Sequence, residues 1–336
     1  MVHLRIVVPS HTAEHALDLL TASPSVCNLI YLERAAQKPE GDVILCDVAR
    51  EDASVIVGDL REFGIDREGS IAMEQIDSEI SEAARRAERA AVGAPSDAVV
   101  WEEVETRTSE NTELSASFLL FIVLACLIAS VGILLDSPIL IIGAMVVGPE
   151  FGPIAGLCVA TVQRRRELMK RSLLPLLIGF PLGITAAFVF ALAIKGTDLT
   201  PGGFTASVHP NTHFISHPDS FSFIVALFAG TAGMLSLTSA KSGALVGVLI
   251  SVTTIPAAAN IGVAAAYGDA SEWRGAQAQL AVNLTAILLA GIATLFIQRK
   301  LYQRRRRAHL HDRSREAAGL PMGHSRRAPD AESPVG

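Results

Sequence analysis

The chain has 336 residues, half of them hydrophobic, and its mean hydropathy is +0.40. This composition excludes an ordinary soluble protein of this length and indicates an integral membrane protein. The formal net charge of −6 averages an acidic N-terminal part, an apolar middle and a basic C-terminal tail, so it says little about partners. The four cysteines have no paired spacing, and we interpret them as reduced, buried side chains.

The N-terminal segment, residues 1–92, is expected to be a soluble cytoplasmic domain. β-Branched runs predict strands at 3–8, 26–32, 42–48 and 69–76, and apolar residues at helical spacing predict helices at 12–21 and 51–63. The order βαββαβ is that of ferredoxin-like domains. Such a domain is typical of a small-ligand sensor or a dimerisation module, and a packing role without a ligand fits equally well.

Two polar segments flank the apolar middle. Residues 93–117 mix acidic and apolar groups, so we interpret them as an amphipathic connector at the membrane surface, with Trp101 at headgroup depth. The alternative is an ordinary solvated linker helix. Residues 299–336 are basic and polar, and we expect a disordered cytoplasmic tail that contacts anionic lipid and no nucleic acid.

Six apolar segments within residues 118–298 are long enough to cross a bilayer core of about 30 Å. They are residues 118–135, 138–162, 172–194, 221–238, 243–267 and 278–297. Basic residues follow the second and sixth segments, at 164–166 and 304–307, so both places are predicted to be cytoplasmic. With an even number of spans, the N-terminus and the C-terminus would both lie in the cytoplasm.

The last three spans resemble the first three in length, and Pro153 and Pro256 fall at equivalent places. A repeat of three spans is odd-numbered, so its second copy would insert in the inverted orientation. We therefore expect an α-helical membrane domain of two inverted three-helix repeats, each with a broken middle helix.

The breaks in the two middle spans are the candidate functional site. Prolines and glycines interrupt the first of them where a helix should be continuous, and Glu150 places an ionisable group in lipid. In the second, hydroxyl and amide side chains surround Pro256. Interrupted helices in both halves of a chain are typical of a transporter's central site. The predicted site for a small solute or ion comprises Gly148, Pro149, Glu150, Gly152, Pro153, Thr253, Thr254, Pro256 and Asn260.

The same residues allow structural interpretations. The prolines can be packing kinks between small residues without any ligand, and Glu150 can be a neutral, hydrogen-bonded structural side chain. His209, His213 and His217 are spaced by four residues, which on one helix could bind zinc or copper, but two prolines among them disfavour such a helix. We expect no metal and no cofactor, and without a nucleophile–base pair the sequence does not predict an enzyme.

The segment from Leu135 to Arg166, LDSPILIIGAMVVGPEFGPIAGLCVATVQRRR, resembles the uncharacterised hydrophobic-domain family known as domain of unknown function 389. The resemblance extends back through Trp101-Glu-Glu-Val and forward across the six spans. It implies a bacterial inner-membrane protein, of an actinobacterial type by its alanine- and arginine-rich style. It implies no substrate and no catalytic residues.

Together these observations predict a membrane transporter or channel for a small solute or ion, with a site near the bilayer midplane and an N-terminal domain that regulates or assembles it. The alternative is a membrane-anchored ligand sensor or scaffold without transport. A polar, hydrated cavity would favour transport, and a dry bundle with a pocketed soluble domain would favour the sensor. The expected partners are the lipid bilayer, the solute or ion, and further copies of the chain in a homo-oligomer.

Overall fold

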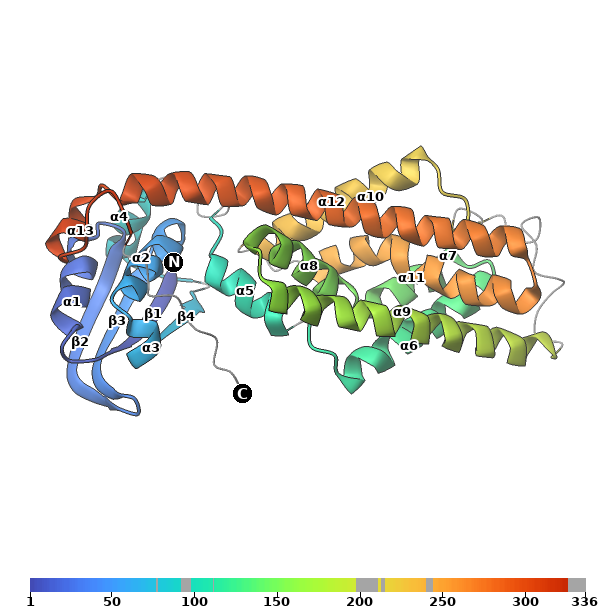
Figure 1. Cartoon of the computed structure of the whole chain (residues 1–336), viewed down its shortest axis with the longest axis horizontal. Coiled ribbons are helices and arrows are strands. Elements are labelled where there is room, and N and C mark those ends of the chain that lie inside the picture. The colour runs from blue at the N-terminus through green and yellow to red at the C-terminus, as the bar shows by residue number, and fades with distance from the viewer. Residues whose placement is uncertain are drawn as a thin grey trace. The chain divides into compact units, whose positions relative to one another are not determined.

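The computed structural model describes residues 1–76, 78–91, 98–110, 112–197, 211–212, 215–239 and 244–325. They form two compact units, whose elements are labelled in Figure 1. The first, called the sheet unit here, comprises the described residues of Met1–Val104, Thr238–Ala240 and Gln298–Gly336. The second, called the helical unit, comprises those of Glu105–Leu237 and Lys241–Ile297. Segments from both ends of the sequence therefore share the sheet unit.

Residues 1–76 of the sheet unit contain the predicted order of strands and helices, with one short extra helix before the last strand. The elements of the sheet unit are β1 (Val2–Val8), α1 (Ala13–Ala22), β2 (Val26–Gln37), β3 (Glu40–Val48), α2 (Arg50–Glu62), α3 (Ile65–Glu68), β4 (Ser70–Gln75), α4 (Glu82–Ala90), the first residues of α5 (Trp101–Glu110), the end of α12 (Ala270–His309) and α13 (Arg313–Ala317). The strands lie in the order β2-β3-β1-β4, and all neighbours are antiparallel. Alternate residues of β1 are buried, as expected for a strand with one face against a core.

The hydrophobic core of the sheet unit is formed by the strands together with α1 and α2. Leu4 and Ile6 of β1 are fully buried, and so are Leu19 of α1 and Leu60 of α2. Ala318, which follows α13, belongs to the same buried cluster. The apolar spacing that predicts the helices thus also supplies the face that packs in this core.

The C-terminal segment differs from the disordered tail expected for residues 299–336, because its described residues are folded within the sheet unit. Helix α12 continues to His309, and α13 follows it. The fully buried guanidinium of Arg315 forms ion pairs with Asp59 and Glu62 of α2. Arg306 pairs with the same two carboxylates at 2.7 Å, and His309 Nε2 lies 2.7 Å from Asp59 Oδ2. Arg306 therefore has protein partners where the sequence suggested anionic lipid.

Trp101 also has protein partners. Its side chain is buried in the sheet unit, with its ring centroid 6.3 Å from that of Tyr302. The Trp101 backbone N–H donates to Ser54 Oγ at 3.0 Å, and Arg50 Nε donates to the Ala98 carbonyl at 3.1 Å. These bonds tie residues 98–101 to α2. The indole is therefore buried against protein, and its depth relative to a membrane stays a prediction.

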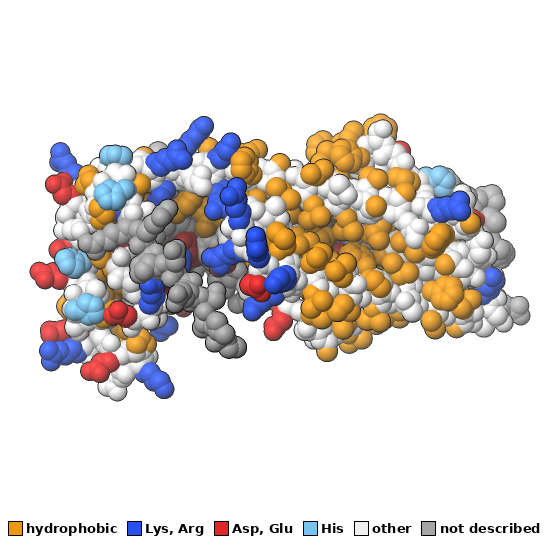
Figure 2. Space-filling view, in the orientation of Figure 1, with side chains coloured by type: hydrophobic (Ala, Val, Ile, Leu, Met, Phe, Trp, Pro, Cys, Tyr) orange, Lys and Arg blue, Asp and Glu red, His pale blue; other side chains and the backbone are white. Residues whose placement is uncertain are grey.

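The helical unit consists of α6 (Ala116–Leu134), α7 (Pro138–Val147), α8 (Phe151–Gln163), α9 (Arg166–Lys195), α10 (Ser220–Thr238), α11 (Ala244–Tyr267) and most of α12. Among the described residues, α6, α9, α10 and α12 are each long and apolar enough to cross a membrane, and α7 with α8 adds a fifth candidate that is bent by 56°. Phe121, Leu177 and Phe228 are exposed, and hydrophobic side chains cover much of the visible face of this unit (Figure 2). Such an apolar surface is typical of a membrane protein.

Helix α11 continues through Pro256, so the break predicted in the second middle span is absent from the described helix. One proline removes one backbone donor, and α9 likewise continues through Pro175 and Pro181. In the first middle span, by contrast, α7 ends where Gly148 and Pro149 follow each other. The two middle spans therefore differ: one is bent and the other is continuous.

Small residues let the helices approach closely. A Cβ atom on Gly262 of α11 would lie 2.7 Å from the backbone nitrogen of Phe188 in α9. A Cβ atom on Gly230 of α10 would lie 2.7 Å from the carbonyl oxygen of Ile287 in α12. Both distances are shorter than carbon atoms allow, so these glycines permit backbone contacts of the kind expected between membrane helices.

Candidate functional site

The break between α7 and α8 follows from Gly148-Pro149. A proline disfavours the helical conformation of the residue before it. Gly148 accordingly has φ −66° and ψ 127°, which is extended, and α7 ends there. Helix α8 begins at Phe151, one residue after Glu150. The last carbonyl groups of α7 and the first N–H groups of α8 thus lie on either side of a three-residue link.

Glu150 occupies the N-cap position of α8, and its side chain is fully buried. Its carboxylate does not cap its own helix. Instead, Glu150 Oε1 accepts a hydrogen bond of 2.8 Å from Thr254 Oγ1, a residue 104 positions further along the chain in α11. The positive end of the α8 dipole favours a negative charge at this position. The structure therefore joins the two predicted halves of the site through an acid and a hydroxyl.

Gly148 leaves the space that the Glu150 carboxyl group occupies. A Cβ atom at position 148 would collide with Glu150 Oε2, and it would lie 2.9 Å from Ile255 Cγ1 in α11. Gly148 therefore does two things: its backbone begins the break, and its missing side chain lets the acid and α11 approach.

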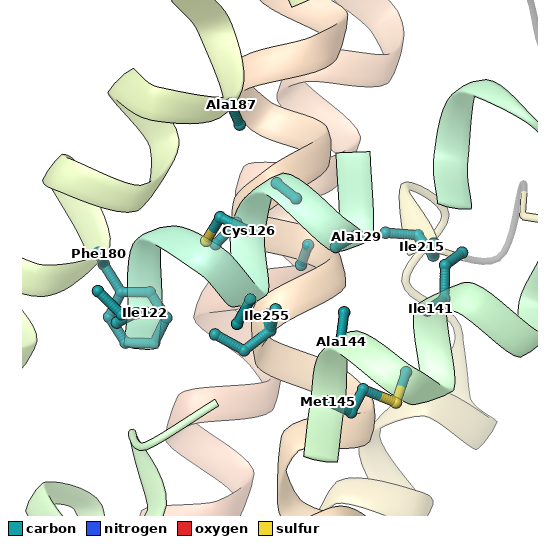
Figure 3. Close-up of a cluster of buried hydrophobic side chains, with 14 of the residues drawn as sticks. Ile122, Cys126, Ala129, Ile141, Ala144, Met145, Phe180, Ala187, Ile215 and Ile255 are labelled. Atoms are coloured by element: carbon teal, nitrogen blue, oxygen red, sulfur yellow. The ribbon is translucent and has the colours of Figure 1, made fainter. Parts of the chain in front are cut away.

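The surroundings of the Glu150–Thr254 pair are apolar. Thr254 and Ile255 are both fully buried, and Ile255 belongs to the large hydrophobic cluster of the helical unit. Figure 3 shows Ile255 of α11 in this cluster with Cys126 of α6 and Ala144 of α7. In such a low-dielectric environment a charge interacts strongly with each nearby dipole or ion. The pair is thus secluded from water in the described conformation.

The other predicted residues of the first break lie in the first turn of α8. Gly152 and Pro153 are its second and third residues. Backbone N–H groups there have no intrahelical acceptor, so Pro153 sacrifices no helical hydrogen bond. These two residues shape the helix start and do not extend the break.

The remaining predicted residues lie in α11. The side chain of Thr253 falls outside the described residues, and Pro256 lies inside the continuous helix. Asn260 is 2% exposed, and its Oδ1 has no hydrogen-bond partner among the described residues. The structure therefore unites Gly148, Glu150 and Thr254, while no described hydrogen bond links Asn260 to them.

Two of the three histidines between α9 and α10, His209 and His213, lie outside the described residues, and His217 is exposed. Sequence reasoning missed another group of possible metal ligands, on strands β2 and β3 and before α4: atoms of Cys27, Asp47 and Glu79 lie within 4.8 Å of one another. Cys27 and Asp47 lie opposite each other in the pairing of β2 with β3. This pairing is not visible in the sequence, so the group could not be predicted from it.

The state of this group argues against a ready-made metal site. Burial, followed by the charges of Glu79 and Asp47, raises the pKa of the Cys27 thiol to about 11. Metals bind the thiolate, so a thiol that stays protonated at neutral pH is a poor ligand. Asn28 Nδ2 already donates to Asp47 at 2.7 Å and to Glu79 at 2.9 Å.

The fold and the site define a class: a membrane-type helical protein with an acid secluded at a helix break and a small α/β unit. The model of the family described as "Domain of unknown function (DUF389)" matches residues 145–289, which confirms the resemblance found in the sequence. The chain is thus similar to this family over that segment, in which Glu150 and Thr254 both lie.

An uncharacterized protein of Methanocaldococcus jannaschii is 28% identical to this chain over 194 residues, which are 58% of each protein. The chain therefore spans less than two thirds of that relative's length. No solved structure gives a significant match. The actinobacterial type suggested by composition stays a prediction.

Proposed function

We propose that this protein is a membrane transporter or channel for a small solute or ion, and that Glu150 binds the cation or proton that moves. The observation that carries the proposal is the fully buried Glu150 carboxyl group at a helix break, bonded to Thr254 Oγ1 of α11 at 2.8 Å. An ionisable group inside a membrane bundle is energetically costly, and such groups mark ion and proton pathways.

The helix break supplies further oxygen atoms. The last carbonyl groups of α7 have no intrahelical donor and carry the negative end of the α7 dipole. Carbonyl oxygens at a helix end, a carboxylate and a hydroxyl are the types of oxygen donor that bind Na⁺ or H⁺ in transporters with broken helices. The apolar shell around the pair fits an occluded state, from which one side of the bundle opens at a time.

A count of spans supports the bent pair as a true crossing. The sheet unit contains ion pairs between α2 and the C-terminal segment, at Asp59 with Arg306 and Arg315, so both ends of the membrane domain must emerge on one side. An even number of crossings is then required. Four single helices, α11 and the bent pair make six, whereas a re-entrant bent pair would leave five.

The remaining architecture follows the same proposal. The strand order β2-β3-β1-β4 with antiparallel neighbours is that of a split-βαβ, ferredoxin-like domain. Arg164 and Arg165 connect α8 to α9, which begins at Arg166, and by the positive-inside rule this basic connection and both termini are cytoplasmic. The bent first middle helix and the continuous second one give any inverted repeat an asymmetric centre.

Cation binding by the purified full-length protein tests this proposal. The unfolding temperature in detergent is measured with NaCl, KCl or choline chloride at equal ionic strength, and over a pH series. We expect Na⁺, K⁺ or protons to stabilise the wild type by mass action and not to stabilise Glu150→Gln, since the amide lacks the charge. Equal responses of both proteins to every cation and pH would contradict the proposal.

The alternative, a membrane-anchored sensor or scaffold without transport, assigns Glu150 a purely structural role. It predicts that Glu150→Gln leaves any response to a soluble ligand of the sheet unit unchanged and that reconstituted protein conducts nothing. One observation in the sheet unit, a pocket lined by polar groups without partners among the described residues, bears on ligand sensing.

A further inference from the structure

The sheet unit contains a pocket of about 120 Å³. Its walls come from the first turn of α2, the segment before α5 and the last third of α12. The lining residues are Glu51, Ala98, Val99, Gln298, Leu301, Tyr302 and Arg305. All of them belong to the sheet unit, so the pocket is separate from the Glu150 site.

The pocket walls are fixed by bonds on their outer sides. Arg50 Nε donates to the Ala98 carbonyl, and the Tyr302 hydroxyl donates to the Ser54 carbonyl at 3.4 Å. Gln298 Nε2 donates to Thr238 Oγ1 at 2.8 Å. These contacts hold elements that are far apart in the sequence around one space, which makes the pocket pre-formed.

Three side chains of the pocket have polar atoms without a hydrogen-bond partner among the described residues. Glu51 is only 6% exposed, and neither of its carboxylate oxygens has a hydrogen-bond partner on another described residue. The same is true of Gln298 Oε1 and of Arg305 Nη2, although Arg305 Nε pairs with Asp52 Oδ1 at 3.4 Å. A buried polar group without a partner keeps an uncompensated desolvation penalty, so a molecule that pairs with all of these atoms binds more tightly than one that leaves any of them unpaired.

The unpaired atoms specify the chemistry of such a molecule. Glu51 and Gln298 offer three acceptors, which match the three N–H donors of an ammonium group. Arg305 Nη2 offers a cationic donor, which matches a carboxylate. Leu301 and Val99 supply apolar wall, and the small volume admits only a handful of non-hydrogen atoms.

We propose that this pocket binds a small zwitterionic amino acid, with its ammonium group at Glu51 and Gln298 and its carboxylate at Arg305. An ammonium group alone would leave Arg305 unpaired, and a carboxylate alone would leave Glu51 unpaired. The site therefore distinguishes the zwitterion from simple amines and simple acids. Because the pocket and the Glu150 site share no residue, this inference stands or falls independently of transport.

Isothermal titration of the full-length protein in detergent tests the inference. The probes are glycine, alanine, serine and γ-aminobutyrate, with methylamine and acetate as half-ligands. We expect at least one amino acid to bind, and both half-ligands to bind at least about tenfold more weakly, since each leaves one charge unpaired. Glu51→Gln and Arg305→Met should each weaken binding by at least about tenfold.

Matched controls exclude general electrostatic effects. Glu14→Gln and Arg304→Met remove exposed charges of the same kinds outside the pocket lining and should leave affinity unchanged. Wild-type protein that is monodisperse and folded but binds none of the four amino acids would overturn the inference. So would binding that persists unchanged in both pocket variants, or acetate binding as tightly as the amino acids.

Discussion

At the scale of single residues, the break depends on Gly148 having no side chain, because the Glu150 carboxyl group occupies the space where a side chain would lie. The Glu150 carboxyl group fills the volume next to the Cα atom of Gly148, and Ile255 of α11 packs on the same spot. A buried acid can keep its place only if its neighbours leave room and supply a donor. Gly148 provides the room and Thr254 the donor.

Gly148→Ala should therefore destabilise the protein and displace Glu150, because the new Cβ would collide with the carboxyl group. We expect a loss of about 1–3 kcal/mol, typical of overpacking in a core. Thermal unfolding of the full-length protein in detergent measures it. Gly143→Ala in α7 is the matched control, because nothing lies within 4 Å of its added Cβ and alanine is the better helix former. Equal stability of both variants would contradict this account of Gly148.

The pKa of Glu51 leads to a second prediction for a single residue. Burial, the largest cause, raises the pKa of Glu51; its own backbone N–H and the Arg305 charge lower it, and the Asp52 and Glu88 charges raise it. A raised pKa in the folded state means that stability falls as pH rises through that value. Glu51→Gln should therefore be more stable than the wild type at about pH 7, with the difference vanishing near pH 4. Unfolding temperatures across this range check it, and a difference that grows toward low pH would refute it.

The residue scale also shows what the sequence can predict. An acid inside an apolar segment and hydroxyls beside a proline are visible by residue type, so Glu150 and Thr254 could both be singled out. Their hydrogen bond could not, because it depends on how α7, α8 and α11 pack. The unpaired atoms of Glu51 and Arg305 leave no trace in the sequence, since each charge there resembles a solvated surface group.

At the scale of elements, prolines have two different effects in this bundle. Pro149 forces Gly148 out of the helical conformation and separates α7 from α8. Pro256 lies inside an uninterrupted α11, where it removes a single backbone donor. The sequence predicts both as breaks, since a proline in an apolar segment has the same appearance in each case. The difference lies in the glycine that precedes Pro149, whereas isoleucine precedes Pro256.

Pro149→Ala should consequently alter the site, while Pro256→Ala should be tolerated. Without Pro149, the link can turn helical and rotate Glu150 away from α11, so we expect loss of cation-dependent stabilisation. Pro256→Ala restores one backbone hydrogen bond of about 1 kcal/mol and should keep that stabilisation. Unfolding temperatures with and without the stabilising cation compare them. The account fails if Pro256→Ala abolishes the response and Pro149→Ala preserves it.

At the scale of the whole molecule, the described C-terminal segment packs in the same unit as the N-terminal strands. Hydropathy locates the apolar helices and their charged flanks, so the membrane-type body could be predicted from the sequence. The folding of residues 299–325 could not, because a run of arginines has the same composition whether it is solvated or paired. Asp59 and Glu62 of α2 are the partners that decide it, by burying Arg315 and binding Arg306. This pairing brings the C-terminal segment into the same unit as the N-terminal strands.

The most direct test of the central claim is cation flux through the reconstituted protein. Liposomes containing the full-length chain are given gradients of H⁺, Na⁺ or K⁺, and flux is compared for wild type, Glu150→Gln and Glu272→Gln. Glu272 is the matched control, a buried acid of α12 bonded to the Ser216 hydroxyl. We predict flux of one cation in the wild type and the control, and a loss of at least about tenfold in Glu150→Gln. Wild-type flux in Glu150→Gln, or no flux of any of the three cations through folded wild-type protein, would contradict the claim.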